Sequence, residues 1–126
     1  HEYIFLLSKS ARYLFDHRAI QEEGGDGKPR NKRSVWTVAT RGGADTNFAT
    51  YPPELVRPCI LAATRPGDTV LDPFAGTCTT GAVALQEGRL FIGAELSPQT
   101  AEAGRKRLTE ASRQVGLFAG EGGAVG

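Results

Sequence analysis

The sequence predicts an α/β fold of the doubly wound, Rossmann-like class with a parallel core. Residues 69–115 alternate strand-like and helix-like segments, a glycine turn at residues 73–76 separates the first strand from the helix after it, and an acid, Glu95, follows the second strand. This order is typical of a right-handed parallel βαβ unit, which binds ligands beyond the carboxyl ends of its strands. With 126 residues, 40% of them hydrophobic and 23% charged, the chain has the composition of one globular domain.

Residues 1–20 predict an antiparallel strand hairpin. A dense apolar run at residues 3–7 and a shorter one at residues 12–15 flank a polar Ser-Lys-Ser turn. We expect Tyr3 and Phe5 to pack in the core, because aromatic side chains on strands usually do.

The next segment, residues 21–34, predicts a flexible basic loop, because it contains several glycines and almost no apolar side chains. A short extended stretch follows at residues 34–38, in which we expect Trp36 to have a packing role.

Residues 35–115 carry the regular elements. A helix is expected to begin in the Pro-Pro-Glu sequence of residues 52–54, because proline is tolerated and an acid is favoured in a first turn. Residues 65–68 predict a turn and residues 69–72 a short buried strand. The buried face of the helix is predicted from apolar residues at helical spacing: Leu55, Val56, Cys59, Ile60 and Ala63.

The second helix follows the glycine turn. Its expected cap is Thr77 or Thr79, and Gly88 is expected to stop it. Residues 90–95 predict a second buried strand.

A serine followed by a proline at residues 97–98 predicts the start of the third helix. The glycine at position 116 is expected to end it and to leave residues 116–126 as a flexible tail.

The glycine turn limits the class of ligand. A phosphate-binding P-loop needs a lysine followed by Ser or Thr after its glycines, and none follows here. A dinucleotide fingerprint needs three spaced glycines, whereas only Gly76 is in place. Glu95 lies 19 residues after Gly76 (95 − 76), close to the roughly 20 expected for a carboxylate on ribose hydroxyls. The pattern fits an adenosine-type cofactor without a pyrophosphate, and it equally fits an ordinary tight turn with a solvated acid.

The sequence Asp-Pro-Phe-Ala-Gly-Thr-Cys-Thr-Thr at residues 72–80 resembles the cofactor motif of S-adenosylmethionine-dependent DNA amino-methyltransferases, typically Asp-Pro-Phe-X-Gly-Ser-Gly-Thr-Thr. Residues 48–55 are similar to the segment before this motif in circularly permuted members. Residues 92–98 resemble the ribose-binding strand end, and residues 1–15 the strand hairpin of those enzymes. The resemblance covers nearly the whole chain except the tail. It implies that residues 21–34 are a candidate target-recognition region and that residues 35–115 are the S-adenosylmethionine-binding portion.

The resemblance implies a role for each matching residue. Asp72, Phe74 and Gly76 would contact the methionine half of the cofactor, and Glu95 its ribose. Thr79 and Thr80 would contact the carboxylate region of the cofactor. Thr50 and Tyr51 would help to close the pocket over its methionine end.

The chain departs from the family pattern in three ways. Cys78 stands where the family usually has glycine, so a side chain enters the turn and would narrow the pocket, although a small buried filler is the expected role of this thiol. Asn47 stands where relatives often have histidine. The family's catalytic signature, Asp, Asn or Ser before Pro-Pro and an aromatic residue, does not occur. We therefore expect an incomplete sheet, a C-terminal portion without the catalytic half, and no methyl transfer by this chain alone.

The resemblance implies double-stranded DNA as a partner, with methyl transfer to adenine N6 or cytosine N4. A non-catalytic module acting with a separate catalytic chain and a small-molecule methyltransferase remain alternatives. The net charge of +1 does not by itself indicate nucleic acid. Four basic residues of the loop are candidate contacts to DNA phosphates, with a merely soluble loop as the alternative: Lys28, Arg30, Lys32 and Arg33.

The sequence does not indicate a zinc site or a membrane span. The two cysteines and two histidines form no zinc-binding spacing. No apolar run is long enough to span a membrane, and we expect a cytoplasmic location.

Overall fold

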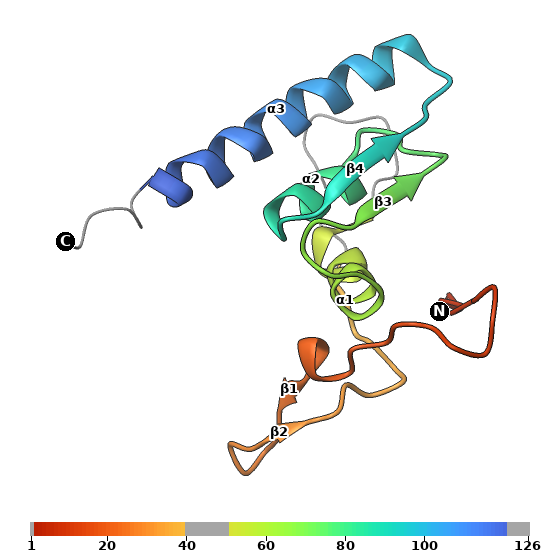
Figure 1. The fold of residues 1–126 in the computed structure, drawn as a ribbon, viewed down its shortest axis with the longest axis vertical. Coiled ribbons are helices and arrows are strands. Elements are labelled where there is room, and N and C mark those ends of the chain that lie inside the picture. The colour runs from red at the N-terminus through yellow and green to blue at the C-terminus, as the bar shows by residue number, and fades with distance from the viewer. Residues whose placement is uncertain (1, 40–50, 121–126) are drawn as a thin grey trace.

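The computed structural model describes residues 2–39 and 51–120. The helix α3 runs along one side of the molecule, the parallel strands and α2 lie between α3 and α1, and the N-terminal segment lies beyond α1 (Figure 1). The elements in chain order are the 3-10 helix η1 (Arg18–Ile20), β1 (Glu22–Glu23), β2 (Pro29–Arg30), α1 (Pro53–Ala63), β3 (Thr69–Asp72), α2 (Thr79–Gln86), β4 (Leu90–Gly93) and α3 (Pro98–Gly120).

The predicted βαβ unit is confirmed. Strands β3 and β4 pair in parallel, from Thr69 opposite Leu90 to Asp72 opposite Gly93. Helix α2 connects them, as a parallel pair requires a crossover, and it packs against both strands and against α1 and α3. Both strands therefore deliver their carboxyl ends to the same edge, next to the glycine turn.

The core lies between α1, α2 and the strands. Ile60, Val83 and Ala84 are buried there, with Val83 only 1% exposed. On α1, Ala62 is buried and Ala63 is exposed, so one position of the predicted apolar face is wrong.

Glycine at position 81 allows α2 to approach its neighbours closely. A Cβ there would lie 2.6 Å from the Phe91 ring and 2.7 Å from Leu108 of α3. Helix α2, strand β4 and helix α3 therefore meet at Gly81, where there is no room for a side chain.

Two helix ends differ from the sequence expectation. The N-cap of α2 is Cys78, in a left-handed conformation and without a side-chain cap bond, rather than Thr77 or Thr79. Helix α3 has its expected cap, because the Thr100 N–H donates to Ser97 Oγ at 3.3 Å. It continues through Gly116 to Gly120, because Gly116 does not adopt the positive φ that terminates a helix. Residues 116–120 are thus helical rather than tail.

The hairpin expected over residues 1–20 is wrong. Within the described part of this segment the structure has no strand, only bends at residues 9–11 and at residue 17, and η1. Tyr3 and Phe5 stack on each other with centroids 6.1 Å apart and are 76% and 77% exposed, so they are not core residues. The turn chemistry is present, since Ser8 Oγ donates to the Ser10 carbonyl at 2.7 Å. A local turn does not supply the neighbouring strands that a hairpin needs for stability.

Residues 21–34 are more ordered than the prediction of a flexible loop. Strands β1 and β2 pair antiparallel, with Glu22 opposite Arg30. The Gly24 N–H donates to the Lys28 carbonyl at 2.8 Å, and Gly27 has a φ of 76°. Glycine supplies this conformation without steric cost, so the residues that predicted disorder instead close a tight turn.

The parallel pair is buried on one face only. Val70 and Phe91 pack on the core, whereas Leu71, Leu90 and Ile92 on the other face are 66%, 59% and 58% exposed. The expectation of fully buried strands is therefore half right. Among the residues described, no helix combines the length and apolar character needed to cross a membrane.

Candidate functional site

The glycine turn lies at the carboxyl ends of β3 and β4. The Ala75 N–H donates to the Ala94 carbonyl at 2.8 Å, which ties the turn to the end of β4. Gly76 has a φ of 53°, and a Cβ at this position would meet nothing within 4 Å. The backbone is therefore open at this point, and a ligand can approach it closely.

Glu95 contacts the glycine turn and the start of α3 through its two carboxylate oxygens. One carboxylate oxygen accepts the Gly76 N–H at 2.9 Å, and the other accepts the Ser97 N–H at 2.8 Å, just before α3. A carboxylate has about four acceptor positions. Glu95 thus orients the turn and retains capacity for further donors such as ribose hydroxyls.

Asp72 is the centre of a hydrogen-bond network with Tyr51 and Thr80. Its Oδ2 accepts from Thr80 Oγ1 at 2.7 Å and from Tyr51 Oη at 3.3 Å, and its Oδ1 accepts the Phe74 N–H at 3.0 Å. Tyr51 Oη also hydrogen-bonds directly to Thr80 Oγ1. Three segments of the chain are joined here through side chains that the sequence analysis selected.

The pKa of the Tyr51 phenol is raised above its ordinary value. Burial is the main cause, and the nearby Asp72 carboxylate acts in the same direction, while the hydrogen bond with Thr80 opposes it. Tyr51 is therefore a neutral hydroxyl at physiological pH and can act as a donor to Asp72.

Thr79 lies on the face of α2 that meets α3. Its hydroxyl accepts a hydrogen bond from Arg107 Nη1 at 2.7 Å, and the same nitrogen contacts Thr77 Oγ1 at 3.0 Å. Both threonines are buried. The Thr79 side chain is thus engaged with α3, and its main-chain N–H belongs to the first turn of α2, where helix donors are unpaired within the helix.

Arg107 is a residue of this region that the sequence analysis missed. It contacts Thr77 and Thr79, which lie about 30 positions earlier in the chain. Only its basic character on a predicted helix was visible in the sequence, and that feature does not distinguish it from neighbouring surface residues.

Contrary to the expectation from the sequence, the Cys78 side chain does not point into the turn. It is 7% exposed and has a φ of 59°. Its Sγ lies 2.6 Å from where a Cβ on Gly104 would be, so the side chain points toward α3 and fills space there. Burial and the Asp72 charge raise the pKa of this thiol, against a lowering by Arg107. The expected role as a small buried filler is confirmed.

The outer rim of the site is apolar and open. Phe74 is 89% exposed and Leu96 is 98% exposed. Thr50, predicted to help close the pocket, and Asn47 lie outside the described residues.

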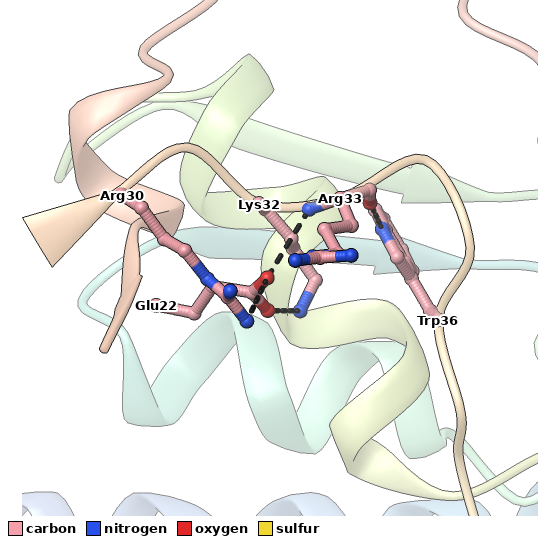
Figure 2. Close-up of polar contacts among 5 residues, drawn as sticks. All are labelled: Glu22, Arg30, Lys32, Arg33 and Trp36. Carbon is pink, nitrogen blue, oxygen red and sulfur yellow. Dashed lines mark hydrogen bonds and ion pairs between the residues drawn. The ribbon is translucent and has the colours of Figure 1, made fainter. Parts of the chain in front are cut away.

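The four basic residues predicted to bind DNA fall into two places. Lys28 lies at the β1–β2 turn, 4.0 Å from Asp26 and strongly exposed. Arg30 and Lys32 contact the Glu22 carboxylate through their side chains, and Arg33 contacts it through its main-chain N–H, as Figure 2 shows. A cavity of about 560 Å³ lies beside these three residues, away from the glycine turn.

Comparison with known proteins identifies the family of the chain. The model of the N6_N4_Mtase family, described as DNA methylase, matches residues 1–106. The chain is 50% identical over 108 residues to the type II methyltransferase M.Cfr9I of Citrobacter freundii, covering 86% of this chain and 36% of that protein. It is 42% identical over 110 residues to the type II methyltransferase M.SmaI of Serratia marcescens, covering 86% and 38%. The chain thus spans little more than a third of these relatives.

A solved structure is similar in both sequence and fold. The crystal structure of the M1.HpyAVI–SAM complex superimposes with a TM-score of 0.60 at 28% identity, covering 79% of this chain and 46% of that one. The family match extends over most of the chain, including the glycine turn and the acid after β4. The chain belongs to the N6_N4_Mtase family of DNA methylases.

Proposed function

We propose that this chain binds S-adenosylmethionine within a DNA methyltransferase that transfers the methyl group to the exocyclic amine of adenine (N6) or cytosine (N4). The observation that carries the proposal is the contact between Glu95 and the open turn at Gly76, at the carboxyl ends of two parallel strands. This edge is where doubly wound sheets bind ligands. When bound, the cofactor supplies an activated methyl group on its sulfonium.

The geometry supports a division of labour among the predicted residues. Glu95 has free acceptor capacity for ribose hydroxyls, and charge-assisted hydrogen bonds of this kind are strong. The open backbone at Gly76 and the carboxylate of Asp72, which three donors orient, would face the methionine half. The exposed ring of Phe74 offers apolar surface beside it.

The carboxylate of the cofactor would lie at the start of α2. Main-chain donors of a helix N-terminus favour an anion, and Thr79 and Thr80 are the first residues of this helix. Tyr51, and Thr50 before it, would close the methionine end. Tyr51 would do so through its bonds to Asp72 and Thr80.

Catalysis would require residues beyond this chain. The sequence has no Pro-Pro-aromatic signature to hold a flipped base, and the chain spans only part of its relatives. The intact enzyme would combine this cofactor-binding part with a catalytic half and double-stranded DNA.

Calorimetric titration with S-adenosylmethionine tests the proposal. The wild-type chain should bind, and Glu95→Gln should weaken binding at least ten-fold, because hydrogen bonds to a charged group contribute about 1.5–3 kcal/mol. Glu110→Gln on the exposed surface of α3 is the matched control and should bind as the wild type does. Equal affinity of Glu95→Gln and wild type would contradict the assignment.

A second experiment tests whether methyl transfer needs residues outside this chain. Incubation of plasmid DNA with the chain and radiolabelled S-adenosylmethionine should leave the DNA unlabelled. Label on the DNA would show that catalysis does not need a further half.

A further inference from the structure

The cluster around Glu22 brings two cations and a main-chain donor to one anion. Strand pairing places Glu22 opposite Arg30, so their side chains are cross-strand neighbours. Glu22 Oε1 lies 3.5 Å from Arg30 Nη2 and accepts the main-chain N–H of Arg33 at 3.3 Å, while Oε2 lies 3.8 Å from Lys32 Nζ. Two positive side chains and one main-chain N–H therefore contact a single carboxylate, as Figure 2 shows.

None of these contacts is tight. Charge-assisted hydrogen bonds are normally about 2.7–2.9 Å long, whereas each contact of Glu22 is 3.3 Å or longer. The side chains remain accessible, with Arg30 43% exposed and Glu22 32% exposed. Exposed ion pairs of this quality contribute little stability, so another anion can displace the carboxylate.

The surroundings suit a phosphate group. The cavity of about 560 Å³ is lined by all four members of the cluster and by the Trp36 ring, with Glu54 of α1 also on its wall. Lys32 Nζ lies 5.1 Å from the centre of the Trp36 ring, and Trp36 Nε1 donates to the Arg33 carbonyl at 2.7 Å. The indole thus fixes the segment that carries Lys32 and Arg33. Guanidinium groups match phosphate oxygens with paired donors.

We propose that this pocket binds a backbone phosphate of DNA and that Glu22 occupies the phosphate position in the free chain. The inference rests on the proposed function, because DNA is the substrate of that enzyme. Arg30 and Arg33 bind the phosphate, and Lys32, held against Trp36, retains Glu22 when the carboxylate moves aside. Lys28, at the β1–β2 turn, does not line this pocket.

The affinity of the full 126-residue chain for a short fluorescein-labelled DNA duplex, measured by anisotropy at several salt concentrations, tests the proposal. Glu22→Gln removes the competing charge and should tighten binding about three- to ten-fold, from the Coulomb energy of a unit charge about 5 Å from the phosphate. Glu23→Gln is the matched control, since neighbouring side chains on a strand point to opposite faces. It should change the affinity less than two-fold.

Arginine variants test the cations that are proposed to bind the phosphate. Arg33→Gln should weaken binding and lower the slope of log affinity against log salt by about one, whereas Arg113→Gln, on the exposed surface of α3, should not. In a background of Arg30→Gln and Arg33→Gln, the gain from Glu22→Gln should disappear. Trp36 is the only tryptophan, so its fluorescence should also change when DNA binds.

Several results would overturn the proposal: no binding of DNA by the wild type, an unchanged or lower affinity of Glu22→Gln, an equal gain in Glu23→Gln, or a gain that persists without the arginines. Circular dichroism spectra show whether each variant is folded. S-adenosylmethionine binding, titrated on the same preparations, separates the two proposals. If the chain binds the cofactor and one of the four contrary DNA results is found, only the phosphate pocket is refuted. If the wild-type chain does not bind the cofactor, the proposed function is refuted.

Discussion

The contact between Cys78 and Gly104 predicts a strong coupling between two substitutions. In Gly104→Ala the new methyl group would lie 2.6 Å from Cys78 Sγ and 3.3 Å from the Gly76 carbonyl. Overpacking of this kind costs about 1–3 kcal/mol, while alanine in a helix interior gains about 1 kcal/mol over glycine. The single substitution should therefore lower the free energy of unfolding by about 1 kcal/mol.

When Cys78 is replaced by glycine, the effect of Gly104→Ala on the free energy of unfolding should change sign. Cys78→Gly relieves a left-handed conformation that costs a non-glycine residue about 1–2 kcal/mol. It also loses a small buried side chain and gains chain entropy in the unfolded state, so alone it should be close to neutral. In this background Gly104→Ala should stabilise by about 1 kcal/mol, because only the 3.3 Å approach to Gly76 remains. The coupling is thus about 2 kcal/mol.

Urea denaturation of the four proteins, followed by far-ultraviolet circular dichroism, measures this coupling. The cycle is informative because the two positions are in direct contact. Additivity of the two substitutions within about 0.5 kcal/mol would refute the packing of Cys78 against α3.

Three further predictions follow from individual contacts. Gly81→Ala should destabilise the chain by about 1–3 kcal/mol because its methyl group would clash with Phe91, whereas Gly116→Ala, with open space around it, should stabilise α3 by about 1 kcal/mol; similar effects in urea denaturation would contradict the packing. The raised pKa of Tyr51 contributes stability that is complete below the ordinary value of 10.0 and is lost as pH rises through the folded pKa. Tyr51→Phe should therefore flatten the decline in melting temperature above pH 10.0, and an unchanged decline would contradict this. Finally, Cys78 should react with iodoacetamide much more slowly in the folded chain than in urea, as peptide mapping would show, because the thiol is buried and its pKa is raised; equal rates would contradict its burial.

Local sequence signals predicted the βαβ unit well. The strand at residues 69–72, the serine cap before α3 and the proline-led start of α1 all appear where the sequence placed them, and the second strand, expected over residues 90–95, covers residues 90–93. Each signal acts within a few residues, through backbone conformation or a helix terminus. The contact between Gly76 and Glu95 also follows, because parallel neighbours deliver their ends to one edge.

The errors arose where structure depends on distant partners. Residues 1–20 have the composition of a hairpin but form no ladder with the residues described, since strand formation needs a neighbour and not only propensity. Residues 21–34 look disordered by composition, yet the hydrogen bonds of their turn order them. The N-cap residue of α2 is Cys78, and the Thr77 and Thr79 hydroxyls accept hydrogen bonds from Arg107 in α3.

Local signals account for the order of elements and the chemistry at the strand ends, because a glycine turn, an acid at a set spacing and helix caps can be identified in the sequence. Which charges meet depends on how the chain folds. The fold separates Lys28 from the other basic residues, places Glu22 among them and directs Arg107 to Thr79. These contacts join side chains up to about 30 residues apart, and their energies depend on distances of a few ångströms that only the folded backbone sets.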